Sequence, residues 1–273
     1  MPEDREDPDA YIARLRREQG YMPFVDHLEE LRQRIIRILL WVLGFAAVSW
    51  FFYAQVFQFV LGPVSHLLSL EQNKLTVKII ATRLFDFFAV EMKISLLTGF
   101  ILAVPPVLFE IWGFVVPALD KKVRSYGNGI LVGAILLFWA GVFFCRQYVW
   151  GVMVEFLALG WAPPPIELPN GQTVRTELHL TLNEYLSFFF SFHILFGLAF
   201  ELPIISLILG MSGVLTTDFF RKYWRHSVVV IAIISGVVTP TDGFSMIAMM
   251  VPLVVLFFLS WGLVSLVEKK MRS

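Results

Sequence analysis

The chain has 273 residues, of which 57% are hydrophobic and only 16% are charged. Its mean hydropathy is +0.71, and soluble domains carry about 25% charged residues, so the composition excludes an ordinary soluble domain and indicates a protein that crosses a membrane several times. The formal net charge is zero, and the single cysteine, Cys145, excludes an intrachain disulfide.

The charge pattern at the two ends of the chain indicates tails outside the membrane. Residues 1–22 carry acidic and then basic side chains without an apolar stretch, so they lack the pattern of a cleavable signal peptide. We expect a flexible cytoplasmic tail there, a membrane domain over residues 23–268 and a cytoplasmic C-terminus over residues 269–273.

The segment FVDHLEELRQRI at residues 24–35 has the pattern of an amphipathic helix. Its apolar residues recur every three or four positions and share one face, and Glu30 can pair with Arg34 one turn later. Two interpretations remain open: an interfacial helix held by arginines, or a docking surface whose carboxylates accept a cationic partner. His27 lies beside glutamates, but no second ligand set has suitable spacing, so we expect no metal site.

Six stretches are long and apolar enough to cross a hydrocarbon core of about 30 Å. The last two come from one apolar run, which the turn-forming cluster TPTDG divides. The fifth helix would reach only about 21 Å, so we expect a thinned or concave region around it. We therefore predict an all-α membrane protein with six transmembrane helices, at about residues 35–60, 87–116, 127–149, 185–209, 226–239 and 244–267.

Several residues mark places where these helices end, bend or meet water. Pro63, Pro106 and Pro252 are expected to shape helix ends and kinks. Lys93 lies at the outer start of the second helix, where a lysine can extend to the membrane surface. Asp242, within TPTDG, is expected to form the turn between the last two helices.

A carboxylate, Glu201, lies inside the fourth predicted helix, in the segment FGLAFELPII. An ionisable residue at mid-membrane costs about 2.5–3.5 kcal/mol on insertion scales, so it usually faces protein or water. Gly197 is one turn earlier, where a small residue lets a second helix approach, and Pro203 removes a backbone donor. Glu201 could therefore make a structural hydrogen bond to a neighbouring helix, or dock a partner helix at a dent in the membrane surface.

The distribution of Lys and Arg predicts the orientation. If the N-terminus is cytoplasmic, sixteen of the 22 Lys and Arg residues fall in cytoplasmic segments and five in outer loops, with Lys93 in the membrane. Because cytoplasmic loops are enriched in these residues, we expect both termini to be cytoplasmic.

Four segments are characteristic when they occur in this order: HLEELRQRI, PPVLFEIWGFVVPAL at residues 105–119, LNEYLSFFFSFHILFGLAFELPI at 182–204, and VTPTDGFSMIAMMVPL at 238–253. Together they resemble the TatC family, the integral membrane subunit of the twin-arginine (Sec-independent) protein translocase. The resemblance implies a cupped arrangement of six helices in the cytoplasmic (inner) membrane of a bacterium, with both termini cytoplasmic.

The resemblance also implies a function. Members of the family bind the twin-arginine signal peptides of folded precursor proteins, assemble with single-span subunits of the TatA and TatB type, and use the proton-motive force for export. Self-association within the complex and contact with the lipid bilayer are implied as well. No nucleic acid, metal or cofactor is expected.

The resemblance assigns candidate residues for binding the signal peptide. Glu30 occupies one recognition position, with Leu31, Arg32 and Arg34 around it, and a carboxylate can accept a guanidinium through two hydrogen bonds.

The second recognition acid of the family falls on Val123 in this chain, which is a departure from the family pattern. We hypothesise that Asp120, in the same loop, replaces it, with Glu110 as the other candidate. Arg124 lies beside them and is included in the candidate site, although basic residues in this loop are also the ordinary signature of the cytoplasmic side.

The family also has a Glu at the position of Glu201, where it contacts polar residues of partner subunits. By resemblance, Glu201, Gly197 and Pro203 are therefore candidates for docking a partner helix.

No glycine-rich phosphate loop, metal-ligand set or nucleophile beside a base is evident in the sequence, so we expect neither catalytic residues nor an enzyme. The main alternative is a proton- or ion-coupled secondary transporter, in which Glu201 and Lys93 would form an ion path. The lack of an evident repeat argues against it. A scaffold that only assembles other membrane proteins is a third possibility.

Overall fold

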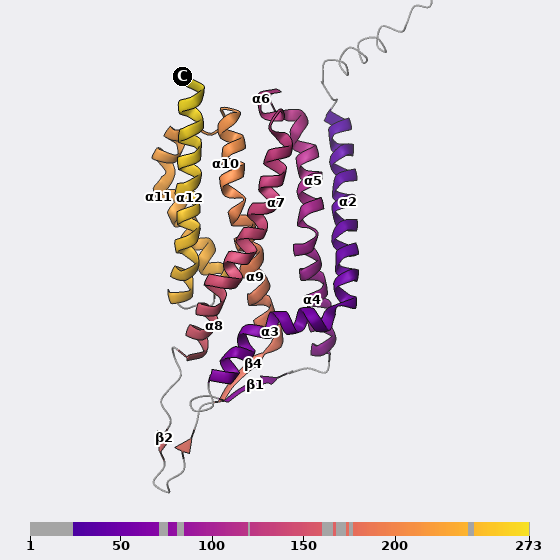
Figure 1. Ribbon diagram of the computed structural model, residues 1–273, viewed down its shortest axis with the longest axis vertical. Helices are drawn as coiled ribbons and strands as arrows, with labels where there is room; N and C mark the ends of the chain where they lie inside the picture. Colours follow the sequence, from indigo (N-terminus) through magenta and orange to yellow (C-terminus); the bar gives the residue numbers. More distant parts are fainter. Residues whose placement is uncertain are drawn as a thin grey trace, which may run out of the picture.

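The computed structural model describes residues 24–70, 76–80, 85–119, 121–159, 166–167, 173–174, 177–239 and 243–272. The longest helices lie roughly side by side along one axis (Figure 1). We call the end where α2 begins and α12 ends the upper end, as in Figure 1, and the opposite end the lower end. The expectations for the N-terminal tail, Asp120 and Asp242 lie outside the described residues.

The first predicted helix, residues 35–60, is divided into two helices. α2 (Phe24–Phe51) contains both the amphipathic segment and the first apolar stretch, and α3 (Tyr53–Leu70) then turns across the lower end of the bundle (Figure 1). The break at Phe52 lies among exposed aromatic residues, which is the composition of a membrane–water interface. Pro63 lies inside α3 and does not end it.

The second predicted helix, residues 87–116, is a bent pair. α4 (Asp86–Leu102) and α5 (Val104–Val115) meet at an angle of 49°. Pro106 belongs to the first turn of α5, where a missing N–H leaves no intrahelical hydrogen bond unmade. The expected bend near Pro106 is thus present. The short segments η1 (Val116–Ala118) and α6 (Lys121–Arg124) lead from α5 into the next helix.

The third predicted helix continues beyond residue 149. α7 (Gly127–Phe144), the π-helical segment η2 (Cys145–Val149) and α8 (Trp150–Leu159) follow one another without a break. The described helix that could span a membrane here covers Gly127–Leu157.

The fourth predicted helix, residues 185–209, is the pair α9 (Leu182–Phe200) and α10 (Leu202–Met211), joined at Glu201. Pro203 lies in the first turn of α10. α10 ends where Gly213 adopts a positive φ of 72°, a conformation that glycine reaches without a steric penalty.

The last two helices are longer than predicted. α11 (Thr217–Val238) has 22 residues and begins where the Thr216 side chain accepts a hydrogen bond from the Phe219 N–H. Its first turns carry charged residues, so the apolar stretch that predicted the fifth helix begins only at residue 226. α12 (Gly243–Arg272) has 30 residues, contains Pro252 in its interior and extends past residue 267.

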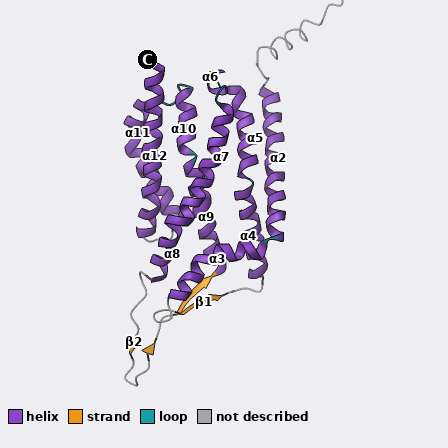
Figure 2. Cartoon of the chain, in the orientation of Figure 1, coloured by secondary structure: helices purple, strands orange, loops and turns teal. Residues whose placement is uncertain are grey.

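Two small strand pairs lie at the lower end (Figure 2). β1 (Thr76–Ile80) pairs in parallel with β4 (Glu177–Thr181), and β2 (Ile166–Glu167) pairs antiparallel with β3 (Thr173–Val174). Among the described residues, four helices are long and apolar enough to cross a membrane, or five with the bent pair. The all-α membrane class is therefore confirmed, and six spans are compatible with it once the partly charged α11 is included.

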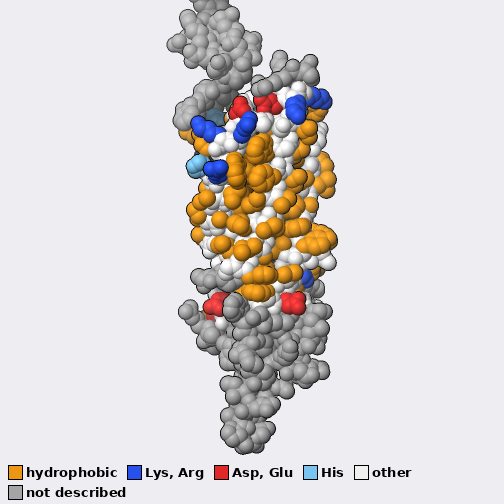
Figure 3. Space-filling model, turned by 90° about the vertical axis from the view of Figure 1, so that its left-hand side faces the viewer, with side chains coloured by type: hydrophobic (Ala, Val, Ile, Leu, Met, Phe, Trp, Pro, Cys, Tyr) orange, Lys and Arg blue, Asp and Glu red, His pale blue; other side chains and the backbone are white. Residues whose placement is uncertain are grey.

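The packing fits a bundle whose outer surface faces lipid. A buried aromatic cluster around Trp150, Phe138, Phe192 and Phe196 joins η2, α7, α8 and α9. In contrast, many large apolar side chains are exposed, and Figure 3 shows them as a band between charged residues at the upper and lower ends. Such a band, flanked by charges, is the arrangement expected for a membrane-spanning protein.

Candidate functional site

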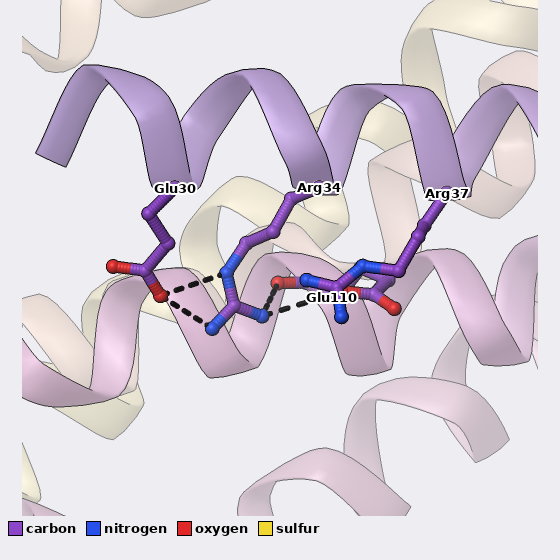
Figure 4. Close-up of polar contacts among 4 residues, drawn as sticks. All are labelled: Glu30, Arg34, Arg37 and Glu110. Carbon is purple, nitrogen blue, oxygen red and sulfur yellow. Dashed lines mark hydrogen bonds and ion pairs between the residues drawn. The ribbon is translucent and has the colours of Figure 1, made fainter. Parts of the chain in front are cut away.

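Three charged side chains on α2 point toward α5 near the upper end (Figure 4). Glu30, Arg34 and Arg37 are spaced by four and three residues, so they share one face of the helix. The Arg34 guanidinium donates to Oε1 of Glu30 from Nε at 3.0 Å and from Nη2 at 2.6 Å. The pairing of Glu30 with Arg34 that the sequence suggested is therefore present.

Glu110 of α5 completes this group, which we call the upper charge cluster (Glu30, Arg34, Arg37 and Glu110). Its Oε2 accepts from Nη1 of Arg34 and lies within ion-pair distance of Nη2 of Arg37, each at 3.3 Å. Its backbone oxygen accepts from Arg34 at 3.1 Å. The residue is only 7% exposed, and the two guanidinium groups compensate for its burial.

Gly113 allows this close approach. A Cβ atom at Gly113, one turn after Glu110, would collide with the guanidinium of Arg34. A larger residue there would displace the guanidinium from this position, so Gly113 leaves the space in which Arg34 lies against α5.

Glu30 is the partly exposed acid of the cluster. Both hydrogen bonds from Arg34 reach Oε1, and no described residue bonds to Oε2. Leu31 is partly buried, whereas Arg32 is exposed and pairs with Glu29 at 3.3 Å. Arg34 thus fixes the carboxylate through Oε1, and Oε2 remains able to accept a hydrogen bond.

A cavity of about 420 Å³ adjoins the cluster, and Gly113 separates the two. Apart from Gly113 and Arg124, its walls are apolar or aromatic. Nη2 of Arg124 donates to the backbone oxygens of Val116 and Pro117, each at 3.2 Å, so this side chain holds the end of α5. The lining residues are Phe109, Trp112, Gly113, Val116, Pro117 and Arg124.

The loop position where the family pattern requires an acid has a structural role in this chain. Val123 is only 1% exposed and belongs to the interior. Glu110, the other candidate for the missing acid, is occupied by two arginines. Asp120 lies outside the described residues, so its proposed role stays a prediction.

Glu201 lies at the junction of α9 and α10 and is only 5% exposed. Its Oε1 has no hydrogen-bond partner among the described residues. Gly197 is in contact with α7, because a Cβ there would collide with the ring of Phe138. Pro203 is buried as well. Of the three candidates for docking a partner helix, Glu201 alone has unused hydrogen-bonding capacity.

Lys93 holds α4 against the first turns of α9. Its Nζ donates to Oδ1 of Asn183 at 2.6 Å and also to Oγ of Ser187. Asn183 and Glu201 are 18 positions apart along α9, which corresponds to about 27 Å. Lys93 and Glu201 therefore make no ion pair, and the path that a secondary transporter would need is not supported.

The sequence did not indicate that Arg37 and Glu110 belong to the upper charge cluster. Arg37 was counted only toward orientation, and Glu110 was considered only as a substitute acid. The spacing of Glu30, Arg34 and Arg37 on one helical face was the available signal, together with an isolated acid in the apolar segment PPVLFEIWGF.

Comparisons with known proteins agree with the resemblance. The family model described as Sec-independent protein translocase protein (TatC) matches residues 26–252. A Sec-independent protein translocase protein TatC from Koribacter versatilis (strain Ellin345) is 30% identical and covers 100% of this chain and 96% of its own length. The TatC protein of Aquifex aeolicus (strain VF5) is 32% identical over 92% of this chain and 98% of its own length.

Two solved structures share the fold. A crystal structure of the twin arginine translocase receptor TatC superposes with a TM-score of 0.73 at 27% identity, covering 89% of this chain and 99% of that one. A second crystal structure of this receptor, in DDM, has a TM-score of 0.72 at 30% identity, covering 87% and 98%.

Proposed function

The chain belongs to the TatC family of Sec-independent protein translocase proteins, and we propose that it is the subunit that binds the twin-arginine signal peptides of folded precursors. The observation that carries this proposal is the Glu30 carboxylate near an apolar cavity: Arg34 holds its Oε1, and its Oε2 has no hydrogen bond to any described residue. The peptide binds at the upper end, which is the cytoplasmic side.

The upper charge cluster suits an arginine-containing peptide. An arginine of the peptide donates to Oε2 of Glu30, while Arg34 keeps the carboxylate oriented from the other side. An apolar side chain of the peptide enters the neighbouring cavity, where Trp112 can also stack on a guanidinium. Asp120 supplies a second carboxylate for the other arginine.

Binding of a twin-arginine peptide to the protein in lipid nanodiscs tests this proposal. Hydrogen bonds to charged groups contribute about 1.5–3 kcal/mol, so Glu30→Gln should weaken binding about 10- to 100-fold. Asp120→Asn should also weaken it, and a twin-lysine peptide should bind poorly to the unchanged protein.

Glu29→Gln is the matched control, since Glu29 is one residue away and pairs with the exposed Arg32. It should bind the peptide almost as well as the unchanged protein. Equal affinity of the Glu30→Gln variant and the unchanged protein would contradict the proposed site.

We also propose that Glu201 docks the single-span subunits of the TatA and TatB type. Oε1 of Glu201 is buried at a helix junction without a hydrogen-bond partner among the described residues, so a polar residue of an incoming helix would satisfy it once the junction opens. Glu201→Gln should then retain most of the partner, and Glu201→Ala should lose it when the complex is purified. Equal loss in both variants would show that the charge itself is required.

In this proposal, export by the assembled translocase draws on the proton-motive force.

Both termini are proposed to lie in the cytoplasm of a bacterium. Cys145 is buried, so introduced cysteines report orientation with little background. An impermeant maleimide should label Glu184→Cys from outside the cell and Lys269→Cys only after permeabilisation. Labelling in the reverse pattern would overturn the orientation, and export that continues after an uncoupler is added would overturn the energy source.

A further inference from the structure

A second cavity, of about 480 Å³, lies between α7, α10 and α12 near the upper end. Its walls are mostly apolar, with one hydroxyl and one amine. The lining residues are Tyr126, Gly129, Ile130, Ile204, Leu207, Met211, Val267 and Lys270. It shares no residue with the upper charge cluster or with the cavity beside that cluster.

Two glycines of α7 explain the shape of this cavity. A Cβ at Gly129 would meet no atom within 4 Å, so the missing side chain leaves open space. One turn further toward the lower end, a Cβ at Gly133 would lie 2.9 Å from Cδ1 of Ile204. α7 and α10 therefore meet at Gly133 and close the cavity on the side toward the middle of the membrane.

The cavity lies where the helices change from apolar to charged. Val267 is the last apolar residue of α12 before Glu268, Lys269 and Lys270. Tyr126 directly precedes α7 and is exposed, as is Lys270. Figure 3 shows Lys and Arg side chains at the upper end, above the hydrophobic band. The apolar part of the cavity is therefore at the depth of acyl chains, and its mouth is at the depth of lipid head groups.

The surroundings of the cavity indicate that its occupant comes from the bilayer. Val132 of α7 and Leu202 and Ile205 of α10 are exposed apolar residues on the adjoining helices. A helix of a partner protein is about 10–12 Å wide and does not fit a cavity that closes at Gly133, whereas a single acyl chain does.

We propose that this cavity binds an anionic phospholipid, with one acyl chain against Ile130, Ile204 and Leu207 and the head-group phosphate beside Lys270. Apolar pockets with a few placed polar groups are typical ligand sites, and basic pockets between transmembrane helices bind anionic head groups. The Tyr126 hydroxyl is placed to donate a hydrogen bond to the lipid near its ester groups.

Native mass spectrometry of the detergent-solubilised protein tests this proposal, with phosphatidylglycerol and phosphatidylcholine of the same acyl chains as probes. The unchanged protein should bind its first phosphatidylglycerol about fivefold more tightly than its first phosphatidylcholine, the contribution expected of one lysine. Lys270→Gln should remove this preference. Gly129→Leu should weaken binding of both lipids, because the leucine occupies the space of the acyl chain.

Matched controls separate the site from general effects. Lys269→Gln removes the same charge one residue away, at a smaller cavity beside Thr217 and Glu268, and should keep the lipid preference. Gly44→Leu adds a leucine at a glycine of α2 that also has open space around it, and should keep the affinity.

Three results would overturn the proposal. They are an unchanged first-lipid affinity in Gly129→Leu, a preference for phosphatidylglycerol that persists in Lys270→Gln, and loss of a single-span partner in Gly129→Leu without any change in lipid binding. Lys270 is exposed, so its variant is expected to fold and gives a result even if the Gly129 variant does not.

Discussion

Glu110 and Glu201 are buried to almost the same extent, with 7% and 5% of their surfaces exposed, but their surroundings are opposite. Glu110, at the upper end, receives two guanidinium groups from α2. Glu201, at the junction of α9 and α10, has a carboxylate oxygen without a partner among the described residues.

The difference in hydrogen-bond partners distinguishes an acid that stabilises the fold, Glu110, from one with an unpaired oxygen, Glu201. A buried polar group without a hydrogen bond costs free energy, and a buried charge costs more. Glu110 is compensated within the chain, so it anchors Arg34 and through it Glu30. Glu201 is not compensated in the same way among the described residues, so a polar partner that reached its buried oxygen would relieve this cost.

The largest expected effect is that of Glu110→Leu. It leaves Arg34 partly buried without one of its carboxylate partners, and removing one member of a buried ion pair costs about 3–5 kcal/mol. Because Arg37 is half exposed, we expect a loss near the lower value, about 3 kcal/mol. The free energy of unfolding, measured by denaturant titration in detergent micelles, checks this. A loss below about 1 kcal/mol would mean that the cluster behaves as a surface ion pair.

Glu201→Leu should have a smaller effect of opposite sign. Replacing an unpaired buried polar group with an apolar one of similar size should raise the free energy of unfolding of the isolated subunit by about 1–2 kcal/mol. The same variant should fail to retain the single-span partners during purification. A destabilisation as large as that of Glu110→Leu would mean that Glu201 has a partner within its own chain, and the contrast would no longer hold.

The smallest effect is expected at the exposed pair of Glu29 and Arg32. Their side chains are 51% and 70% exposed, and such pairs contribute about 0–1 kcal/mol. Glu29→Ala should change the free energy of unfolding by less than about 1 kcal/mol, and added salt should reduce even that difference. A larger change would show that this face of α2 is coupled to the buried cluster.

Much of the fold could be predicted from the sequence. The membrane class followed from composition, and the bend before α5 followed from Pro106. The boundaries at Phe52 and Thr217 could not be predicted in the same way. A count of apolar residues continues across Phe52, although the helix breaks there, and it stops short of Thr217 because the first turns of α11 are charged although helical.

The candidate site was predicted in part. Glu30 and Arg34 are one turn apart, so their pairing is a local property that the sequence reveals. Glu110 is 76 positions from Arg34, and nothing in its local sequence identifies the partner. Gly197 was predicted to let a second helix approach, but only the structure shows that α7 of this chain, at Phe138, is in contact with it.

By itself, the sequence determined the membrane class, most of the helical segments and the family, because these depend on composition, on local periodicity and on motifs. Only the tertiary structure decided which buried acid is paired and which is not, and where glycines leave room for a guanidinium or a lipid chain. Those outcomes depend on contacts between helices distant in sequence, and burial fixes the energetic consequence only once the neighbours of a side chain are known.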